Sequence, residues 1–142
     1  MEAARVGVIL DSSILIAAER GGQTVRQILS DVRAAQGEID IGLSVATIAE
    51  LLHGAYRAGS EARQRRRLEF IEELCRDVPL YPVTLEVVRL VGKIEGQEEA
   101  KGMRISFEDL LIGATALHLG YSVITHNVRH FRLIPGLSVV QF

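Results

Sequence analysis

Three carboxylates and one amide occupy positions from which they could bind a divalent cation together. Asp11 directly follows the first apolar run of the chain, and Asn127 comes two residues after the apolar run that ends at Thr125. Glu50 and Asp109 lie in segments whose apolar residues have helical spacing. Oxygen ligands of this kind suit Mg²⁺ or Mn²⁺. We therefore expect an oxygen-only metal site, since the histidines have no cysteine partners at the spacing of a zinc site.

Each of these residues also has a purely structural explanation. Asp11 could cap the helix predicted to follow it, and Asn127 could fill a turn. Glu50 and Asp109 each come three residues after a hydroxyl side chain, which is the spacing of a helix capping box. These hydroxyl residues are Thr47 and Ser106. If the helix around Glu50 begins at Ser44 instead, capping does not explain that glutamate, and a solvated helix face is the remaining structural explanation.

The elements that must position these residues alternate between strands and helices. Short apolar runs predict strands over residues 5–10, 39–43, 78–81, 121–125 and 138–141. Apolar residues at helical spacing predict helices over residues 12–19, 24–35, 45–58, 61–76, 85–101 and 107–119. This alternation predicts an α/β fold with a central parallel sheet of about five strands covered by helices on both faces. Sites in such sheets form beyond the carboxyl ends of the strands.

Composition excludes several classes of protein. The chain has 142 residues, of which 48% are hydrophobic and 24% charged, so it is not intrinsically disordered and we expect one domain over residues 1–142. Cys75 is the single cysteine, which excludes an internal disulfide and favours a reducing, cytoplasmic location. No apolar run approaches the roughly 18 residues of a membrane span. The net charge of −2 excludes nucleic-acid binding by the whole surface but not by a local basic groove.

Four stretches taken in chain order carry a family resemblance. They are Asp11 after the first apolar strand, SVATIAELLHG around Glu50, EDLLIGATALHLG around Asp109, and VITHNVRHFRLIPGL near the end. This chain resembles PIN-domain proteins, most closely the VapC group of toxin–antitoxin ribonucleases, over its whole length. The resemblance implies a PIN-like three-layer sandwich and endonucleolytic hydrolysis of RNA that depends on Mg²⁺ or Mn²⁺. It also implies a small VapB-type antitoxin that blocks the site, and a homodimer.

The resemblance also implies roles for individual residues. Asp11, Glu50 and Asp109 would be the catalytic metal-binding acids, and Asn127 matches a fourth ligand position that varies between Asp and Asn in the family. His130 stands where many relatives have a further Asp, so this chain is neutral at both late positions.

Further residues near these motifs are candidates for supporting roles. Ser13 and Thr125 are hydroxyls that could orient a metal ligand or contact the substrate. Glu108 could compensate for the missing late acid, and Arg129 and Arg132 are placed to contact RNA.

Four arginines on one predicted helix (Arg63, Arg65, Arg66 and Arg67) are explained by a solvated face that nearby glutamates balance. The alternative for this cluster is contact with RNA phosphates or with an acidic antitoxin tail.

Three other functions are compatible with parts of this pattern. A housekeeping PIN nuclease in RNA maturation would use the same acids, and a catalytically inactive PIN module would only bind. A phosphotransfer enzyme with Asp11 as nucleophile would need a second Asp two residues later, where this chain has Ser13.

Overall fold

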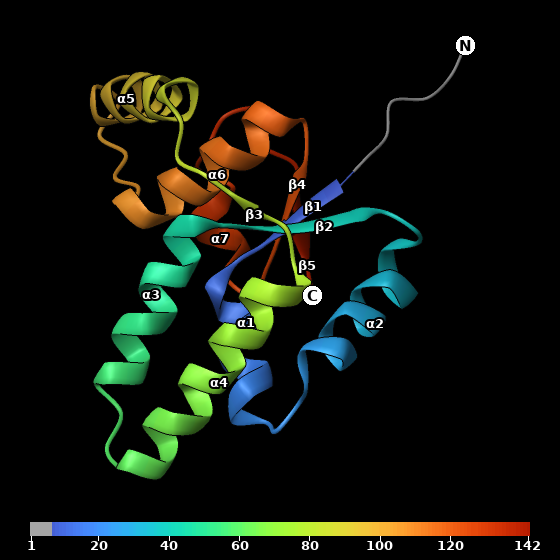
Figure 1. Cartoon of the computed structure of the whole chain (residues 1–142). Helices are drawn as coiled ribbons and strands as arrows, with labels where there is room; N and C mark the ends of the chain where they lie inside the picture. Colours follow the sequence, from blue (N-terminus) through green and yellow to red (C-terminus); the bar gives the residue numbers. More distant parts are fainter. Residues whose placement is uncertain (1–6) are drawn as a thin grey trace.

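The computed structural model describes residues 7–142, and a sheet of five parallel strands lies at its centre (Figure 1). The strands are β1 (Gly7–Leu10), β2 (Asp40–Ser44), β3 (Leu80–Tyr81), β4 (Ser122–Thr125) and β5 (Val139–Gln141). Their order across the sheet is β3-β2-β1-β4-β5, and every neighbouring pair is parallel. The predicted parallel α/β sheet is confirmed. Residues 5 and 6 of the first predicted strand lie outside the described residues.

Helices cover both faces of this sheet (Figure 1). They are α1 (Ser12–Arg20), α2 (Val25–Gln36), α3 (Val45–Tyr56), α4 (Glu61–Asp77), α5 (Leu85–Glu99), α6 (Phe107–Leu119) and α7 (Val128–Phe131). The six helices predicted from apolar spacing are all present. The sequence did not predict α7, because four residues are too few to show a helical period. Among residues 7–142, no helix is long and apolar enough to cross a membrane.

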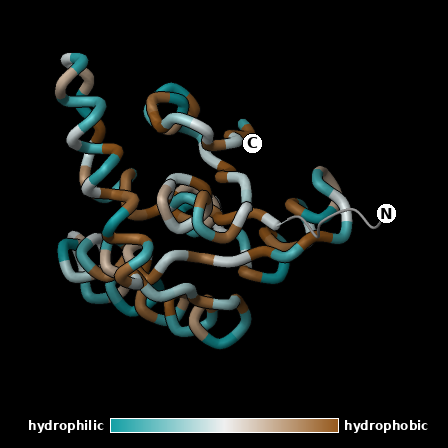
Figure 2. Tube along the Cα trace, turned by 90° about the horizontal axis from the view of Figure 1, so that it is seen from above, coloured by the Kyte–Doolittle hydropathy of each residue, from teal (hydrophilic) through white to brown (hydrophobic). Residues whose placement is uncertain are grey.

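Alternate side chains of β1 divide the hydrophobic core between the two faces of the sheet. Val8 and Leu10 pack with residues of α1 to α4, whereas Ile9 packs with residues of α5, α6 and α7. Successive side chains of a strand point to opposite faces, and all three of these are buried because both faces are covered. Figure 2 shows hydrophobic and hydrophilic residues alternating along the surrounding helices, as expected for helices with one buried side.

Two glycines in the sheet make room for two tyrosine rings. A Cβ atom on Gly42 would lie 2.4 Å from the ring of Tyr81, and one on Gly7 would lie 2.5 Å from the ring of Tyr121. The two rings meet edge to face with their centroids 6.1 Å apart. The Tyr121 hydroxyl also donates a hydrogen bond to Oδ2 of Asp40 at 3.2 Å. The glycines therefore allow this aromatic pair to lie directly against the strands.

Replacing Gly42 by Ala is expected to lower the free energy of unfolding by about 2 kcal/mol, because the new methyl group must displace the Tyr81 ring. Urea unfolding checks this value. Gly92→Ala is the matched control, since a Cβ atom there meets no atom within 4 Å and Gly92 lies in the exposed part of α5. This control should raise the free energy of unfolding by about 1 kcal/mol. Equal stability of the Gly42→Ala variant and the original protein would contradict the close packing.

Candidate active site

Asp11 lies at the point where the strand order of the sheet reverses. The chain proceeds from β1 towards β2 on one side, whereas β4 lies on the other side of β1. Asp11 comes directly after β1, and its backbone N–H donates to the carbonyl oxygen of Ile124 in β4 at 3.0 Å. Only 2% of Asp11 is exposed. In open parallel sheets this reversal opens a crevice beyond the strand ends, where ligands bind.

Two hydroxyl groups hold one oxygen of the Asp11 carboxylate. Ser13 Oγ donates to Asp11 Oδ2 at 2.7 Å, and Thr125 Oγ1 donates to the same oxygen at 2.8 Å. The side chain makes no capping hydrogen bond to α1, although Asp11 occupies the N-cap position. The capping explanation of this residue is therefore wrong. Within the described part of the chain, Oδ1 accepts no hydrogen bond and is left for another ligand.

The same two hydroxyls connect Asp11 to the segment that follows β4. The N–H of His126 donates to Ser13 Oγ at 3.1 Å, and the N–H of Asn127 donates to Thr125 Oγ1 at 2.8 Å. Asn127 is exposed at the N-cap of α7 and makes no side-chain capping bond there. The position of the Asn127 backbone is thus coupled to the position of the buried carboxylate.

Glu50 enters the same region from α3. The helix begins after Ser44, whose Oγ accepts the N–H of Ala46 at 3.1 Å, so Glu50 falls in the second turn and the capping-box explanation is wrong. Ser12 Oγ donates to Glu50 Oε2 at 3.0 Å. Thr47, the rejected capping residue, is buried, and its hydroxyl has no hydrogen-bond partner among the described residues.

Burial and neighbouring charges raise the pKa of Glu50 to about 7. Burial is the largest cause, and repulsion from the carboxylates of Glu108, Asp11 and Asp109 adds to it. The hydrogen bond from Ser12 opposes this shift only in part. Glu50 is therefore a partly buried acid whose charge is disfavoured by its surroundings and by three nearby carboxylates.

Asp109 completes this region from the first turn of α6. The Ser106 Oγ accepts the N–H of Asp109 at 3.2 Å, as predicted from their N-cap to N3 spacing. Burial raises the pKa of Asp109, and repulsion from Asp11 and Glu108 adds to the shift, while Ser106 and His130 lower it. His130 Nδ1 lies 3.8 Å from Asp109 Oδ2.

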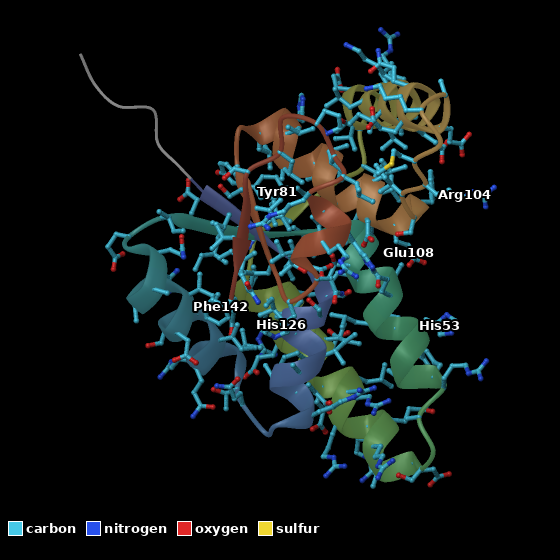
Figure 3. All side chains as sticks on the ribbon, turned by 180° about the vertical axis from the view of Figure 1, so that it is seen from behind. His53, Tyr81, Arg104, Glu108, His126 and Phe142 are labelled. Atoms are coloured by element: carbon cyan, nitrogen blue, oxygen red, sulfur yellow. The ribbon has the colours of Figure 1, made fainter. Side chains whose placement is uncertain are left out.

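The remaining candidates are more exposed. Glu108 is exposed at the beginning of α6, and Figure 3 shows it beside the upper end of α3. Arg129 lies in α7 and Arg132 directly after it; both are exposed, and neither makes an ion pair within residues 7–142.

Figure 3 also shows His126 and Phe142 close together at the end of the sheet, where His126 Nδ1 lies 3.0 Å from the Phe142 oxygen.

The structure thus brings four carboxylates into one electrostatic region without placing them as a ligand set. Asp11 and Glu108 raise the pKa values of both Glu50 and Asp109, and Asp109 also raises the pKa of Glu50. Among the described residues, however, no group of three or more His, Cys, Asp or Glu side chains is positioned to hold a metal ion as it stands. Side-chain rotations would have to bring the oxygens together. The donor chemistry nevertheless fits a hard divalent cation, because the donors are oxygen atoms with excess negative charge.

Ser12 is the functional candidate that the sequence analysis missed. Its hydroxyl reaches Glu50 across 38 residues of sequence. The only local signal was its place after a strand and before a helix, which a helix start explains equally well. The fold and site together define an α/β protein with a group of acidic side chains near the reversal of a parallel sheet.

Known proteins similar to this chain belong to a family of ribonucleases. The PIN-domain family matches residues 8–137. "Ribonuclease VapC1" of Rickettsia felis is 35% identical over 135 residues, which is 95% of this chain and 96% of the relative. The structure of VapBC-1 from nontypeable Haemophilus influenzae has a TM-score of 0.78 and 26% identity, with 95% of this chain and 97% of that chain covered. The chain belongs to the PIN-domain family, among the VapC ribonucleases.

The fold is shared with further toxin–antitoxin structures at lower identity. VapBC2 from Rickettsia felis, bound to a DNA fragment from its promoter, has a TM-score of 0.80 and 20% identity, covering 96% of this chain and 98% of that chain. This likeness shows that the arrangement of strands and helices is common to the group.

Proposed function

We propose that this protein is a metal-dependent endoribonuclease and the toxin of a VapBC-type toxin–antitoxin module. The observation that carries the proposal is the buried Asp11 carboxylate, held by Ser13 and Thr125 at the reversal of the sheet and faced by two further acids. These acids, Glu50 and Asp109, have raised pKa values, chiefly because they are partly buried and further because neighbouring carboxylates repel their charge. A divalent cation is the natural counter-charge for such a group of acids.

Asp11, Glu50 and Asp109 would hold Mg²⁺ or Mn²⁺, and Asn127 would add a neutral oxygen ligand. When bound, the ion would supply a water of lowered pKa and would neutralise charge on the phosphate. Ser13 and Thr125 both donate to Oδ2 of Asp11, so Oδ1 would be the oxygen that binds the ion. Ser12 orients Glu50 in the same way through Oε2. Water attack would leave a 3′-hydroxyl and a 5′-phosphate.

The partners follow from the same assignment. We propose a VapB-type antitoxin as the cognate partner, because the related structures are VapBC toxin–antitoxin complexes. A homodimer is proposed on the same family grounds. The exposed guanidinium groups of Arg129 and Arg132, next to Asn127, would contact phosphates of the RNA near the cleavage point.

Incubating purified protein with a panel of structured RNAs tests the activity directly. Cleavage in Mg²⁺ or Mn²⁺ that stops in EDTA and returns when the metal is restored is the expected result. Cleavage that persists unchanged in EDTA would contradict the role of the metal. Absence of cleavage together with absence of Mg²⁺ or Mn²⁺ binding in calorimetry would favour an inactive PIN binding module.

The two hydroxyls around Asp11 give a second prediction. Thr125→Val removes one donor to Asp11 Oδ2 and leaves the N–H of Asn127 without its acceptor. Cleavage should fall by about 10- to 100-fold, as for other groups that orient a metal ligand. The free energy of unfolding should fall by about 1–3 kcal/mol. Single-turnover cleavage and urea unfolding measure the two effects.

Thr115→Val is the matched control for this variant. Thr115 is equally buried, but its hydroxyl donates to the Leu111 carbonyl within α6 at 2.7 Å. That carbonyl also belongs to the helix ladder, so we expect little change in cleavage. Equal rates for the Thr125→Val and Thr115→Val variants would show that Thr125 does not orient Asp11 for the reaction.

A further inference from the structure

A cleft beside the candidate active site carries an excess of arginine. The arginine cleft is formed by Arg20 at the end of α1 and by Arg63, Arg66 and Arg67 of α4, together with Glu19 and Gly22; its volume is about 500 Å³. Four arginines and one glutamate give this cleft three net positive charges, on a chain whose net charge is −2. Such a concentration of charge attracts a polyanion.

Three of these arginines are free to bind an outside anion. Arg20, Arg63 and Arg66 are exposed, and none makes an ion pair within the part of the chain that the structure describes. Guanidinium groups bind phosphate oxygens through paired N–H donors, which makes arginine well suited to a phosphate chain. The guanidinium groups of Arg20, Arg63 and Arg66 are therefore accessible from solvent.

Arg67 is the fixed member of the cleft. It is half-buried, and its Nη1 donates to the carbonyl oxygen of Gly54 in α3 at 3.0 Å. Its Nε lies 3.8 Å from Oε2 of Glu19 in α1. These contacts join α1, α3 and α4, which lie together in the lower half of Figure 1. The guanidinium of Arg67 is therefore held in place without a ligand.

A small pocket connects the arginine cleft with Glu50. This pocket of about 60 Å³ lies between α1, α3 and α4, and apolar side chains of these helices line it together with Glu50, Glu19, Arg20 and Arg67. Glu19, Arg20 and Arg67 also line the arginine cleft. A strand that passes Glu50 can therefore continue over this pocket to the arginines. Figure 3 shows nitrogen-tipped side chains gathered around these lower helices.

We propose that the arginine cleft binds the phosphate backbone of the RNA substrate at a distance from the cleaved bond. This inference rests on the proposed ribonuclease function, which places the RNA at Asp11 and Glu50. The four carboxylates around that site repel an RNA strand, and the cleft offers the opposite charge along the same path. The cleft contributes affinity that does not depend on base sequence, because phosphate contacts carry no sequence information.

Binding of fluorescently labelled single-stranded polyuridine, followed by anisotropy over a range of NaCl concentrations, tests the proposal. An Asp11→Asn background prevents cleavage during the measurement. In that background, Arg20→Gln with Arg63→Gln should weaken binding about tenfold. It should also reduce the slope of log affinity against log salt by about 1.4, the value for two lost contacts to a single strand.

Arg65→Gln with Arg76→Gln is the matched control. It removes the same charge from the protein, but these arginines line an adjoining surface with Glu69, Glu72 and Glu73. That surface meets the arginine cleft at Arg66, Glu19 and Gly22, whereas Arg65 and Arg76 do not line the cleft. We expect affinity and salt slope close to those of the background. Equal effects of the two pairs, no effect of either pair, or no binding of polyuridine at all would each overturn the proposal. Unchanged RNA binding would leave the cleft to an acidic protein segment.

Single-turnover cleavage by proteins with an intact Asp11 separates this inference from the proposed function. One outcome is that the original protein cleaves RNA in Mg²⁺ and the Arg20→Gln, Arg63→Gln variant binds RNA normally. The nuclease function is then supported, and RNA binding by the arginine cleft is refuted. The opposite outcome is an original protein that cleaves no RNA and binds no Mg²⁺ or Mn²⁺, while the Arg20→Gln, Arg63→Gln variant loses polyuridine binding and the Arg65→Gln, Arg76→Gln variant does not. In that case the cleft is an RNA-binding surface and the nuclease is refuted.

Discussion

Asp11→Asn is expected to reduce RNA cleavage at least about a thousandfold, because it removes the most buried carboxylate of the proposed metal site. The Asn side chain keeps the shape of Asp11 and can still accept hydrogen bonds from Ser13 and Thr125. The loss of one negative charge also relieves repulsion on Glu50 and Asp109. The variant should therefore melt at the same temperature as the original protein in EDTA, or above it.

Single-turnover cleavage, thermal melting and calorimetric titration with Mn²⁺ together measure these effects. Asp77→Asn is the matched control, since Asp77 is an exposed residue at the end of α4 and the substitution is chemically the same. We expect the control to cleave and to bind Mn²⁺ normally. Full cleavage by a well-folded Asp11→Asn variant would refute the site assignment, whereas a lowered melting temperature would show that Asp11 acts mainly in the fold.

Glu50→Gln is expected to make the metal-free protein more stable at pH 8 but not at pH 4. The pKa of Glu50 is about 7 in the folded protein against 4.5 as the reference value, so the folded state binds this proton more tightly than the unfolded state does. Stability of the original protein therefore decreases as the pH rises from about 4.5 to 7 and is lowest, for this group, above pH 7. Glutamine remains neutral throughout and avoids the loss.

The gain should be about 1–2 kcal/mol at pH 8, after allowance for the solvent that reaches this half-buried group. Urea unfolding in EDTA at both pH values measures it, with the exposed Glu69→Gln as control. Adding Mg²⁺ at pH 8 should stabilise the original protein more than the Glu50→Gln variant, because the ion would replace the missing counter-charge. A Glu50→Gln variant less stable than the original protein at pH 8 would contradict the charge excess.

The sequence determined the kinds of element and their order. Short apolar runs and helical spacing record locally which side of a segment is buried, so the parallel sheet and its six longer helices could be predicted. The positions of Asp11 after β1 and of Asn127 after β4 could also be predicted, because each follows a short apolar run. The short α7 could not be predicted, since its four residues show no helical period.

Tertiary structure decided between explanations that the sequence left open. Whether Asp11 capped α1 depended on where Ser13 and Thr125 point, and Thr125 lies 114 residues away in sequence. Whether Glu50 was a cap depended on the residue that begins α3, which the structure shows to be Ser44. Hydrogen bonds and desolvation act through space, so the sequence alone could not give the raised pKa of Glu50.

For the arginines of α4, too, the sequence determined one property and the tertiary structure another. Their sequence established a cluster of like charge, but not which members share a surface. Rotation about the helix axis places Arg63 with Arg20 of α1, whereas Arg65 lies among glutamates on the neighbouring surface. The sequence thus determined which charges and ligands this protein has available, because composition and period are local. Only the packing of α1 against α3 and α4 decided which of them meet, because those contacts join distant parts of the chain.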